Sequence, residues 1–335
     1  MILKYLLFSI FTVNVSFSQW QWQNPLPQGN ILFGSYFLNS NTGYVCGDGG
    51  VIYKTVNGGV NWSSSNSGIA AVNLRSIAFA DSDNGTVVGD NGTIYVTSDA
   101  GASWSAQTSG TANNLLKVKY FGSNLYATGE YGTILSGSGG VWTSIVTRTK
   151  SDIRGLTGTS VSDVHVCGGG GFIRNNKSGS SNFFNFENNP MMANLVDIFF
   201  YDANKGWAVS SLNGVIIYTA NGGSNWNKIN SGLPYRWVTR VTVHPDSANV
   251  CYITLSGYKV DSTGSHIFRT TNYGANWTSI KGNLPDAPVN DVLLDPINTN
   301  TLYIATDITV MVTTNLGAQW NILAAGIPSN VPCHD

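Results

Sequence analysis

Charged side chains are scarce in this sequence. Asp, Glu, Lys and Arg make up 10% of its 335 residues, only Glu130 and Glu187 are glutamates, and the formal net charge is −1. Such a balance gives no electrostatic reason to bind nucleic acid or an anionic membrane. We also find no run of eighteen apolar residues and no convincing amphipathic helix, so we expect no membrane insertion. Neither nucleic acid nor a membrane is therefore an expected partner.

Residues with typical catalytic spacing are also lacking. The four histidines (His165, His244, His266 and His334) show no metal-ligand spacing, and no Ser-His-Asp arrangement can be argued. The glycine run at residues 168–171 does not join a strand to a helix, so it is a turn and not a phosphate-binding loop. We therefore expect no metal and no cofactor.

Cysteine is rare, and its positions argue against a disulfide framework. Cys46 and Cys167 fall at the same place in different repeats, and Cys251 lies in a similar strand. Equivalent positions in non-adjacent repeats cannot bring their Cα atoms within about 7 Å. We interpret these three as small buried apolar residues and leave Cys333 undecided.

The N-terminal eighteen residues have the pattern of a signal peptide. Lys4 precedes an apolar stretch, and the segment ends with the small residues Ser16 and Ser18 around Phe17. We expect cleavage before Gln19 and a secreted chain, extracellular or at the cell surface, with the periplasm as an alternative.

Gly, Asn, Ser and Thr dominate the polar positions, and one block recurs. It reads T-V-N-G-G-V-N-W from Thr55 and T-S-D-A-G-A-S-W from Thr97, and it returns at Thr219, Thr270 and Thr313. A sixth copy ending at Trp142 is one residue short, and residues 175–184 form a seventh copy without Trp. The successive Trp spacings are 42, 38, 84, 51 and 43, which gives seven repeats when 84 is divided in two.

A period of 40 to 50 residues with four short strands is typical of a propeller blade. In the second repeat we expect strands at residues 74–79, 86–89, 93–97 and 104–107, and in the fifth at 195–200, 207–210, 215–219 and 226–229. The sequence thus predicts an all-β, seven-bladed propeller of four-stranded antiparallel blades over residues 19–335. We interpret the recurring block as a structural turn, formed by Asn57, Trp62, Asp99, Trp104, Trp142, Asn221, Trp226, Asn272, Trp277, Asn315 and Trp320.

The two ends suggest an incomplete eighth blade. Trp20 and Trp22 resemble a lone outermost strand, and the segment from Ile327 repeats the one from Leu284. We hypothesise that the chain is truncated at its C-terminus and that a longer product would complete this blade, which would leave no exposed sheet edge.

Together the glycine turn, the G-x-(I/V) strand and the block resemble the BNR or Asp-box repeat. The closest resemblance, clear at residues 43–62, 85–104 and 206–226, is to the family of the photosystem II assembly factor Ycf48. Later repeats with His244-Pro245-Asp246 or Asp295-Pro296 look more like sortilin and xyloglucanase repeats. The resemblance covers the mature chain and implies the fold, but little about function, because hydrolases, receptors and assembly factors share this blade.

Arginines on the innermost strands are the candidate binding residues. Arg75 and Arg154 share one position, and Arg240 lies one place later, so their guanidinium groups could converge on a carboxylate or an acidic peptide. The resemblance implies the same, since Ycf48-like propellers carry an arginine patch. The alternative is that each Arg pairs with an acid of its neighbourhood, such as Asp197 or Asp291. We interpret Asp48, Asp90 and Glu130 as turn residues, and the segment 81–85 as a turn and not a calcium loop.

Three functions remain open from the sequence. The preferred one is a monomeric, non-catalytic binding or assembly scaffold for a protein, an acidic peptide or a glycan. The second is a glycoside hydrolase of the sialidase or xyloglucanase kind, although no pair of placed carboxylates is evident. The third is the surface module of a longer adhesin or receptor.

Overall fold

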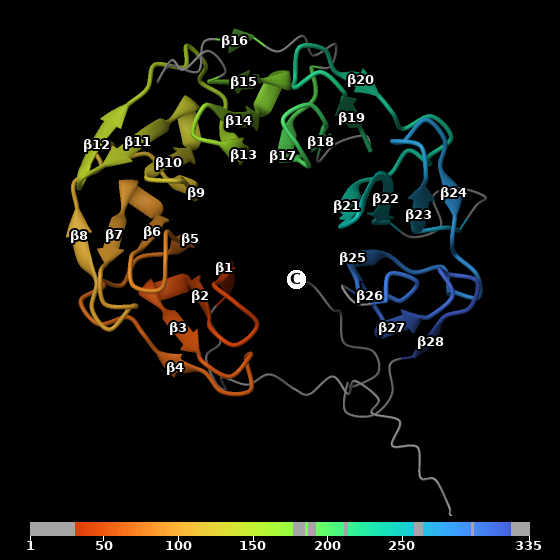
Figure 1. The fold of residues 1–335 in the computed structure, drawn as a ribbon, viewed down its shortest axis with the longest axis horizontal. Coiled ribbons are helices and arrows are strands. Elements are labelled where there is room, and N and C mark those ends of the chain that lie inside the picture. The colour runs from red at the N-terminus through yellow and green to blue at the C-terminus, as the bar shows by residue number, and fades with distance from the viewer. Residues whose placement is uncertain are drawn as a thin grey trace, which may run out of the picture.

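The computed structural model describes residues 31–176, 185–186, 192–210, 214–257, 264–295 and 298–322. They form seven four-stranded antiparallel sheets arranged around a central axis (Figure 1). The predicted all-β propeller is therefore confirmed. The predicted signal peptide, Trp20, Trp22, Glu187, Cys333 and most of the degenerate repeat at 175–184 lie outside the described residues.

Every sheet is a meander in which strands follow one another in chain order, and we call each sheet a blade. Blade 1 has β1 (Leu32–Phe37), β2 (Gly43–Gly47), β3 (Ile52–Thr55) and β4 (Ser63–Ser64); blade 2 has β5 (Leu74–Phe79), β6 (Gly85–Gly89), β7 (Ile94–Thr97) and β8 (Ser105–Gln107). Blade 3 has β9 (Leu115–Phe121), β10 (Asn124–Gly129), β11 (Ile134–Ser138) and β12 (Val141–Ser144); blade 4 has β13 (Ile153–Ser160), β14 (Asp163–Gly168), β15 (Ile173–Asn175) and β16 (Asn185–Phe186).

Blade 5 has β17 (Leu195–Phe200), β18 (Gly206–Ser210), β19 (Ile216–Thr219) and β20 (Asn227–Lys228); blade 6 has β21 (Val238–His244), β22 (Ser247–Leu255), β23 (Ile267–Thr270) and β24 (Thr278–Ser279). Blade 7 has β25 (Val289–Leu294), β26 (Leu302–Thr306), β27 (Val310–Thr313) and β28 (Asn321–Ile322). The first strand of each blade lies nearest the axis (Figure 1). In blades 2 and 5, the strand ends predicted from sequence differ from those observed by at most one residue.

The core consists of apolar side chains sandwiched between neighbouring blades. Between blades 1 and 2, for example, Leu74, Phe79 and Trp104 of blade 2 pack on Tyr44 and Cys46 of blade 1. The Phe79 ring stacks on the Tyr44 ring at a centroid distance of 4.1 Å. Because each blade packs only on its neighbours, the stability of the ring is approximately the sum of the contributions of the blades and of the interfaces between them.

Tryptophan side chains join consecutive blades through their indole N–H groups. Trp104 is 3% exposed and donates to the carbonyl O of Ser65 in the preceding blade at 2.7 Å. Trp320 donates to the carbonyl O of Ile280 at 2.9 Å, and Trp277 to that of Ile229. Replacing such a buried indole by Ala would cost about 3–5 kcal/mol.

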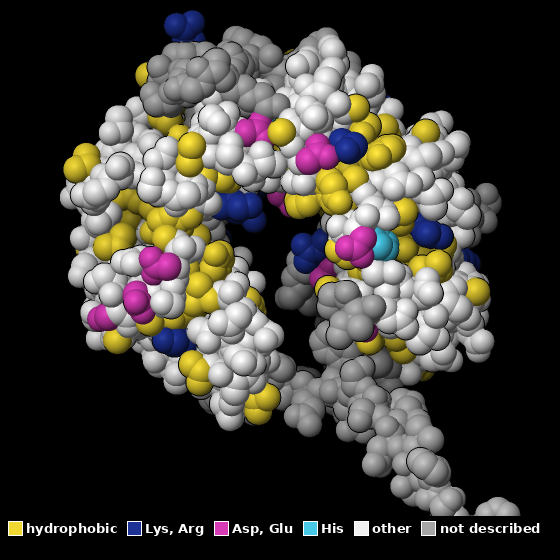
Figure 2. Space-filling model, in the orientation of Figure 1, with side chains coloured by type: hydrophobic (Ala, Val, Ile, Leu, Met, Phe, Trp, Pro, Cys, Tyr) yellow, Lys and Arg dark blue, Asp and Glu magenta, His cyan; other side chains and the backbone are white. Residues whose placement is uncertain are grey.

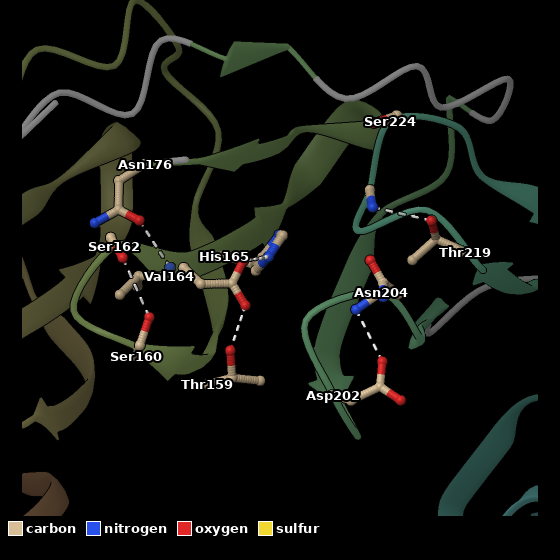
Figure 3. A network of polar contacts seen from close by, with 12 residues as sticks. Thr159, Ser160, Ser162, Val164, His165, Asn176, Asp202, Asn204, Thr219 and Ser224 are labelled. Carbon is tan, nitrogen blue, oxygen red and sulfur yellow. Dashed lines mark hydrogen bonds and ion pairs between the residues drawn. The ribbon is translucent and has the colours of Figure 1, made fainter. Parts of the chain in front are cut away.

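The recurring block forms the turn between the third and fourth strands, with one hydrogen-bond pattern. In blade 5, Thr219 Oγ1 accepts the N–H of Gly223 at 2.9 Å (Figure 3). The same hydroxyl donates to Asn221 Oδ1 at 2.9 Å. Asn221 Oδ1 also accepts the N–H of Asn225 at 2.9 Å. The same bonds recur around Thr55, Thr97, Thr270 and Thr313. The block therefore satisfies buried backbone groups in each of these five blades.

The block requires glycine because its turn meets the preceding blade. Gly274 has φ 86°, and a Cβ added there would lie 2.4 Å from Cδ1 of Ile229. At Gly317 a Cβ would lie 2.6 Å from the carbonyl O of Ile280. Any other residue would meet both an unfavourable backbone conformation and a steric clash.

The three cysteines of the described residues are buried, as expected. Cys46, Cys167 and Cys251 have 0% exposure and belong to three separate core clusters. The turn at residues 81–85 also matches its interpretation, because Asp81 Oδ1 accepts the N–H groups of Asp83 and Asn84 at 2.8 Å. Asp202 makes the equivalent bonds in blade 5 (Figure 3).

Two interblade interfaces differ from the others. The innermost strands β17 and β21 of blades 5 and 6 approach each other less closely than other neighbours, and β18 contacts β21 instead. The ribbons of blades 1 and 7 stand apart on either side of a gap (Figure 1).

Candidate functional site

One face of the ring carries the turns between second and third strands together with the connections between blades. The side chains of Asn73, Asn114, Asp152 and Asn194 each precede an innermost strand and accept a backbone N–H from such a turn in the preceding blade. Their donors are Gly49, Asn91, Tyr131 and Gly170, at 3.3, 2.9, 3.4 and 2.9 Å. These bonds fix adjacent blades relative to each other on this face.

These four linking residues were not among those predicted from the sequence. Their signal is an Asn or Asp directly before the first apolar residue of each innermost strand, as in Asn114-Leu115 and Asp152-Ile153. Asp48, Asp90 and Glu130 begin the turns themselves, which are short 3-10 segments (η1 Asp48–Gly50, η2 Asp90–Gly92 and η3 Glu130–Gly132).

Arg75 forms a bidentate ion pair with Asp90 of the same blade. Its Nε and Nη2 donate to the two carboxylate oxygens of Asp90 at 2.7 and 2.9 Å, and Asn73 Nδ2 donates to Oδ2 at 3.1 Å. The hydrogen bond from Arg75 is the main reason that the pKa of Asp90 is lowered. The guanidinium also lies 4.5 Å from the centroid of the Phe33 ring. Asp90 thus does more than form a turn.

Arg154 is the most accessible of the three candidate arginines. Its side chain is 52% exposed, and among the described residues only Nη2 is bonded, to Asp152 Oδ2 at 2.8 Å. Arg154 lines a cavity of about 540 Å³ together with Lys150, Asn194 and Val196. The guanidinium therefore keeps donors that can reach a ligand.

Arg240 bridges blades 6 and 7. Its Nε and Nη2 donate to Asp291 Oδ1 and Oδ2 at 2.6 and 3.1 Å. The side chains of Arg240 and Asp291 are 37% and 28% exposed. This pair is the one that the alternative interpretation of the arginines named.

The structure does not gather the three arginines in one pocket. They stand in blades 2, 4 and 6, each beside its own carboxylate. Arg154 and Arg240 line two cavities that share Val196, whereas Arg75 lines neither of these two.

The second cavity opens along the central channel, where β17 and β21 leave space. It has a volume of about 580 Å³ and is lined by apolar side chains of β17, β18, β21 and β25, with charged groups among them. Figure 2 shows charged side chains facing the central opening of the ring. The charged residues on the cavity wall are Lys119, Asp197, Arg240 and Asp291.

The second cavity combines a cationic side chain, Lys119, with two exposed apolar side chains. Burial lowers the pKa of Lys119, and the charge of Asp197 opposes that shift. Phe199 and Leu293 line the cavity while 48% and 51% exposed. The indole N–H of Trp207, on the same wall, is buried without an acceptor in the part of the chain that the structure describes.

A register break in every blade sets which side chains reach the channel. In β17 the pairing with β18 shifts between Leu195 and Asp197, and equivalent breaks occur in the other six innermost strands. Such a bulge re-aims the following side chains. Asp197, Arg240 and Asp291 all follow the break directly.

Two buried histidines make carboxylate contacts that the sequence did not suggest. His165 Nε2 lies 3.0 Å from Asp163 Oδ1, and Asp163 also accepts a bond from Thr159 (Figure 3). The His165 ring stacks on Phe200 of blade 5 at 3.8 Å. This network supports the contact between blades 4 and 5.

The second histidine lies in blade 6. His266 Nε2 is 2.8 Å from Asp286 Oδ1, and its ring nitrogens lie 2.9 and 3.0 Å from Arg236 Nη1. The hydrogen bond from His266 is the main reason that the pKa of Asp286 is lowered. The hydroxyl of the adjacent Ser265 bonds instead to Ser279 Oγ and the Ile267 carbonyl O. The geometry is therefore not that of a Ser-His-Asp nucleophile.

No group of three or more His, Cys, Asp or Glu side chains in the described ranges could hold a metal ion. Among the described residues there is also no helix long and apolar enough to cross a membrane.

No family model and no curated protein matches the chain. Solved propellers do match it. Ycf48 bound to a D1 peptide is 18% identical, with a TM-score of 0.61 over 84% of this chain and 90% of that one. Ycf48 from Cyanidioschyzon merolae is also 18% identical, with a TM-score of 0.60 over 84% and 94% of the two chains. The similarity to Ycf48-like propellers is thus confirmed for the fold.

A xyloglucanase of the GH74 type from Xanthomonas campestris is 12% identical, with a TM-score of 0.52. The match covers 89% of this chain and 46% of that enzyme. At these identities the likeness shows a common fold, and function has to be argued from the site.

Proposed function

We propose that this chain is a secreted, non-catalytic scaffold that binds an acidic segment of a protein partner where the two cavities meet. The observation that carries this proposal is the combination of accessible cations with exposed apolar side chains at one place. Arg154 and Lys150 line the first cavity, and Lys119, Phe199 and Leu293 line the second.

The cations favour a carboxylate ligand. Arg154 uses one nitrogen for Asp152 and is 52% exposed, so the remaining N–H groups can form a bidentate pair with an Asp or Glu side chain. Arg75 and Arg240 are each neutralised by a bidentate carboxylate, so their role is to position the strands. Arg154 is therefore the arginine we assign to ligand binding.

The apolar wall favours a peptide over a small anion. Phe199 and Leu293 remain about half exposed in the channel, and exposed apolar groups beside polar ones are typical of interaction sites. The D1 peptide bound to the similar propeller Ycf48 is consistent with peptide binding by this architecture.

Hydrolysis of a glycosidic bond is less well supported. Asp197 and Asp291 are the carboxylates on the wall of the second cavity, and Asp291 is held by Arg240. Two available carboxyl groups are needed for that chemistry. Glycan hydrolysis is one outcome of the test that follows, and a role as a module of a longer adhesin stays a separate hypothesis.

The test is a fluorescence polarisation screen with acidic peptides that contain Leu or Phe, and with matched peptides in which Asn and Gln replace Asp and Glu. We expect binding of the acidic set, and roughly tenfold weaker binding in Arg154→Gln or Lys119→Gln, since a charge-assisted hydrogen bond is worth about 1.5–3 kcal/mol. Lys228→Gln in the outermost strand β20 is the matched control and should bind like wild type.

Equal binding of both peptide sets, or no effect of Arg154→Gln and Lys119→Gln, would refute the proposed site. Release of reducing sugar from a panel of plant and bacterial glycans would favour the hydrolase instead. N-terminal sequencing of the exported protein tests secretion, with Gln19 as the expected first residue, and sedimentation velocity tests the expected monomer.

A further inference from the structure

The turn between the second and third strands of blade 3 carries an exposed tyrosine in an unfavourable backbone conformation. Tyr131 has φ 52° and is 67% exposed. The residues at its position in the turns of blades 1, 2 and 4 are Gly49, Asn91 and Gly170. Gly and Asn are residue types that adopt positive φ readily. The backbone therefore does not favour a bulky side chain at this position.

Packing within the chain does not compensate for that conformation. Tyr273, which also has positive φ, stacks its ring on that of Tyr218 in the preceding blade at a centroid distance of 5.4 Å. The ring of Tyr131 makes no such contact in the part of the chain that the structure describes. Strained residues that the surrounding packing does not explain are often functional. The ring of Tyr131 is thus available to a ligand.

A second exposed aromatic side chain replaces one of the links between blades. Trp237 directly precedes the first residue of β21. In blades 2–5 this position holds the linking residues described above, Asn73, Asn114, Asp152 and Asn194. The main chain of Trp237 is placed like theirs, because its carbonyl O accepts the N–H of Ser256 at 2.9 Å, as that of Asn73 accepts an N–H in blade 2. An indole has no hydrogen-bond acceptor, so Trp237 cannot form the link, and it is 59% exposed.

The backbone that carries Trp237 is held by a buried polar contact. Arg236 is 4% exposed, and its Nη1 lies 2.9 and 3.0 Å from the two ring nitrogens of His266. Tyr235, on the other side of Arg236, is 72% exposed. The two exposed rings therefore stand on either side of a fixed residue. Such preorganisation lowers the entropy lost when a ligand binds.

Both exposed positions adjoin the two cavities described above, on the face that carries the links between blades. The N–H of Tyr131 donates at 3.4 Å to Oδ1 of Asp152, which lines the first cavity. Trp237 directly precedes Val238, which lines the second cavity. The two cavities share Val196. One path therefore leads from Tyr131 across both cavities to Trp237.

We propose that Tyr131 and Trp237 contact the two ends of the bound segment, which crosses both cavities with an acidic residue at Arg154 and with apolar residues, such as Leu or Pro, on either side of it. This inference rests on the proposed function and specifies the partner as an extended acidic segment with apolar flanks. Tyr and Trp supply large, rigid contact areas and are the residue types most often critical in protein interfaces. The cations lie between the two rings, at Arg154 and Lys119.

The experiment measures fluorescence polarisation of labelled peptides with the full chain. Each peptide has a central Asp-Glu pair, with Leu and Pro on both sides, on the N-terminal side, on the C-terminal side or on neither side, and with Ser in their place elsewhere. The variants are Tyr131→Asn and Trp237→Asn, since Asn stands at these positions in other blades, as Asn91 and Asn73. Tyr201→Asn is the control, because Tyr201 is 38% exposed in a turn between first and second strands, on the opposite face.

We expect the peptide with both flanks to bind each variant about fivefold more weakly than wild type, a common loss when an interface aromatic side chain is removed. Each variant should keep its effect with one of the one-sided peptides and lose it with the other, and the two variants should differ in which peptide that is. Neither variant should lower Tm, because Asn suits the backbone of both positions. The control should bind like wild type.

Wild-type affinity of both variants for the peptide with two flanks would overturn the inference, and the proposed function would still stand if Arg154→Gln weakened binding. Equal effects of a variant on all four peptides would overturn the inference as well, because the rings would then not contact the flanks. Equal binding of a peptide with Asn-Gln in place of Asp-Glu would instead refute the proposed function itself.

Discussion

The hydroxyl of Thr219 offers the most direct test of the turn block. Thr219 is fully buried, and its Oγ1 accepts the N–H of Gly223 while it donates to Asn221 Oδ1. Thr219→Val keeps the shape of the side chain and removes these two bonds, together with the 3.3 Å bond that Oγ1 accepts from the N–H of Asn221. The N–H of Gly223 then stays buried without a partner, which costs about 1–3 kcal/mol, so we expect a loss of about 2 kcal/mol.

Thermal and urea unfolding measure this loss. We expect Tm to fall by about 4 °C, since 1 kcal/mol lowers Tm by about 2–4 °C in domains of 150–250 residues and by less in a larger one. Thr219→Ser keeps the hydroxyl and removes a methyl group, and it should cost only about 1 kcal/mol. Thr278→Val, at an exposed position of β24, should change stability by less than about 0.5 kcal/mol.

The relative stability of these variants tests whether the hydrogen bonds of Thr219 stabilise the turn. If Thr219→Val is as stable as Thr219→Ser or more so, the volume of the side chain and not its hydrogen bonds would determine the stability of the turn. The reasoning for the other four copies would then fail too.

Three further predictions concern charge, glycine and the links between blades. Because Arg75 lowers the pKa of Asp90, their pair should stabilise the fold above the ordinary Asp pKa of about 3.9 and lose this effect as pH falls through the lowered value. The difference in unfolding free energy between wild type and Asp90→Asn, measured by urea unfolding at several pH values, should therefore shrink below about pH 4. A difference that stays constant with pH would contradict this. Gly274→Ala should lower Tm more than Gly110→Ala, because both residues have positive φ but only Gly274 would place a Cβ against Ile229; equal losses would show that backbone conformation alone matters. Asn194→Ala should speed hydrogen exchange of the Gly170 amide, whose acceptor is Asn194 Oδ1, whereas Asn194→Asp should preserve its protection; the same rate in both variants would exclude the link.

The blades could be predicted because their signals are local. The Thr, Asn, Gly and Trp of one block lie within eight residues, and each contributes to a single turn and its packing. The recurrence of that block gives the number of blades, and the apolar runs between blocks place the strands within a residue or two.

The partners of the arginines could not be predicted because they depend on register. Arg75 is the unpaired residue within the break of its strand and reaches Asp90 in its own blade, whereas Arg240 follows the break and reaches Asp291 in the next. A shift of one place in a strand reverses the direction of a side chain. For the same reason the sequence did not bring His266, Arg236 and Asp286 together, which are up to fifty residues apart.

The reactivity of the buried cysteines can be used to follow the unfolding of the ring. Burial raises the pKa of Cys46 to about 12 and also raises that of Cys251, so neither thiol supplies the thiolate that alkylating reagents attack at neutral pH. Cys46, Cys167 and Cys251 belong to separate clusters between different pairs of blades. Mass spectrometry of the alkylated chain would thus report the sequence in which three parts of the ring come apart.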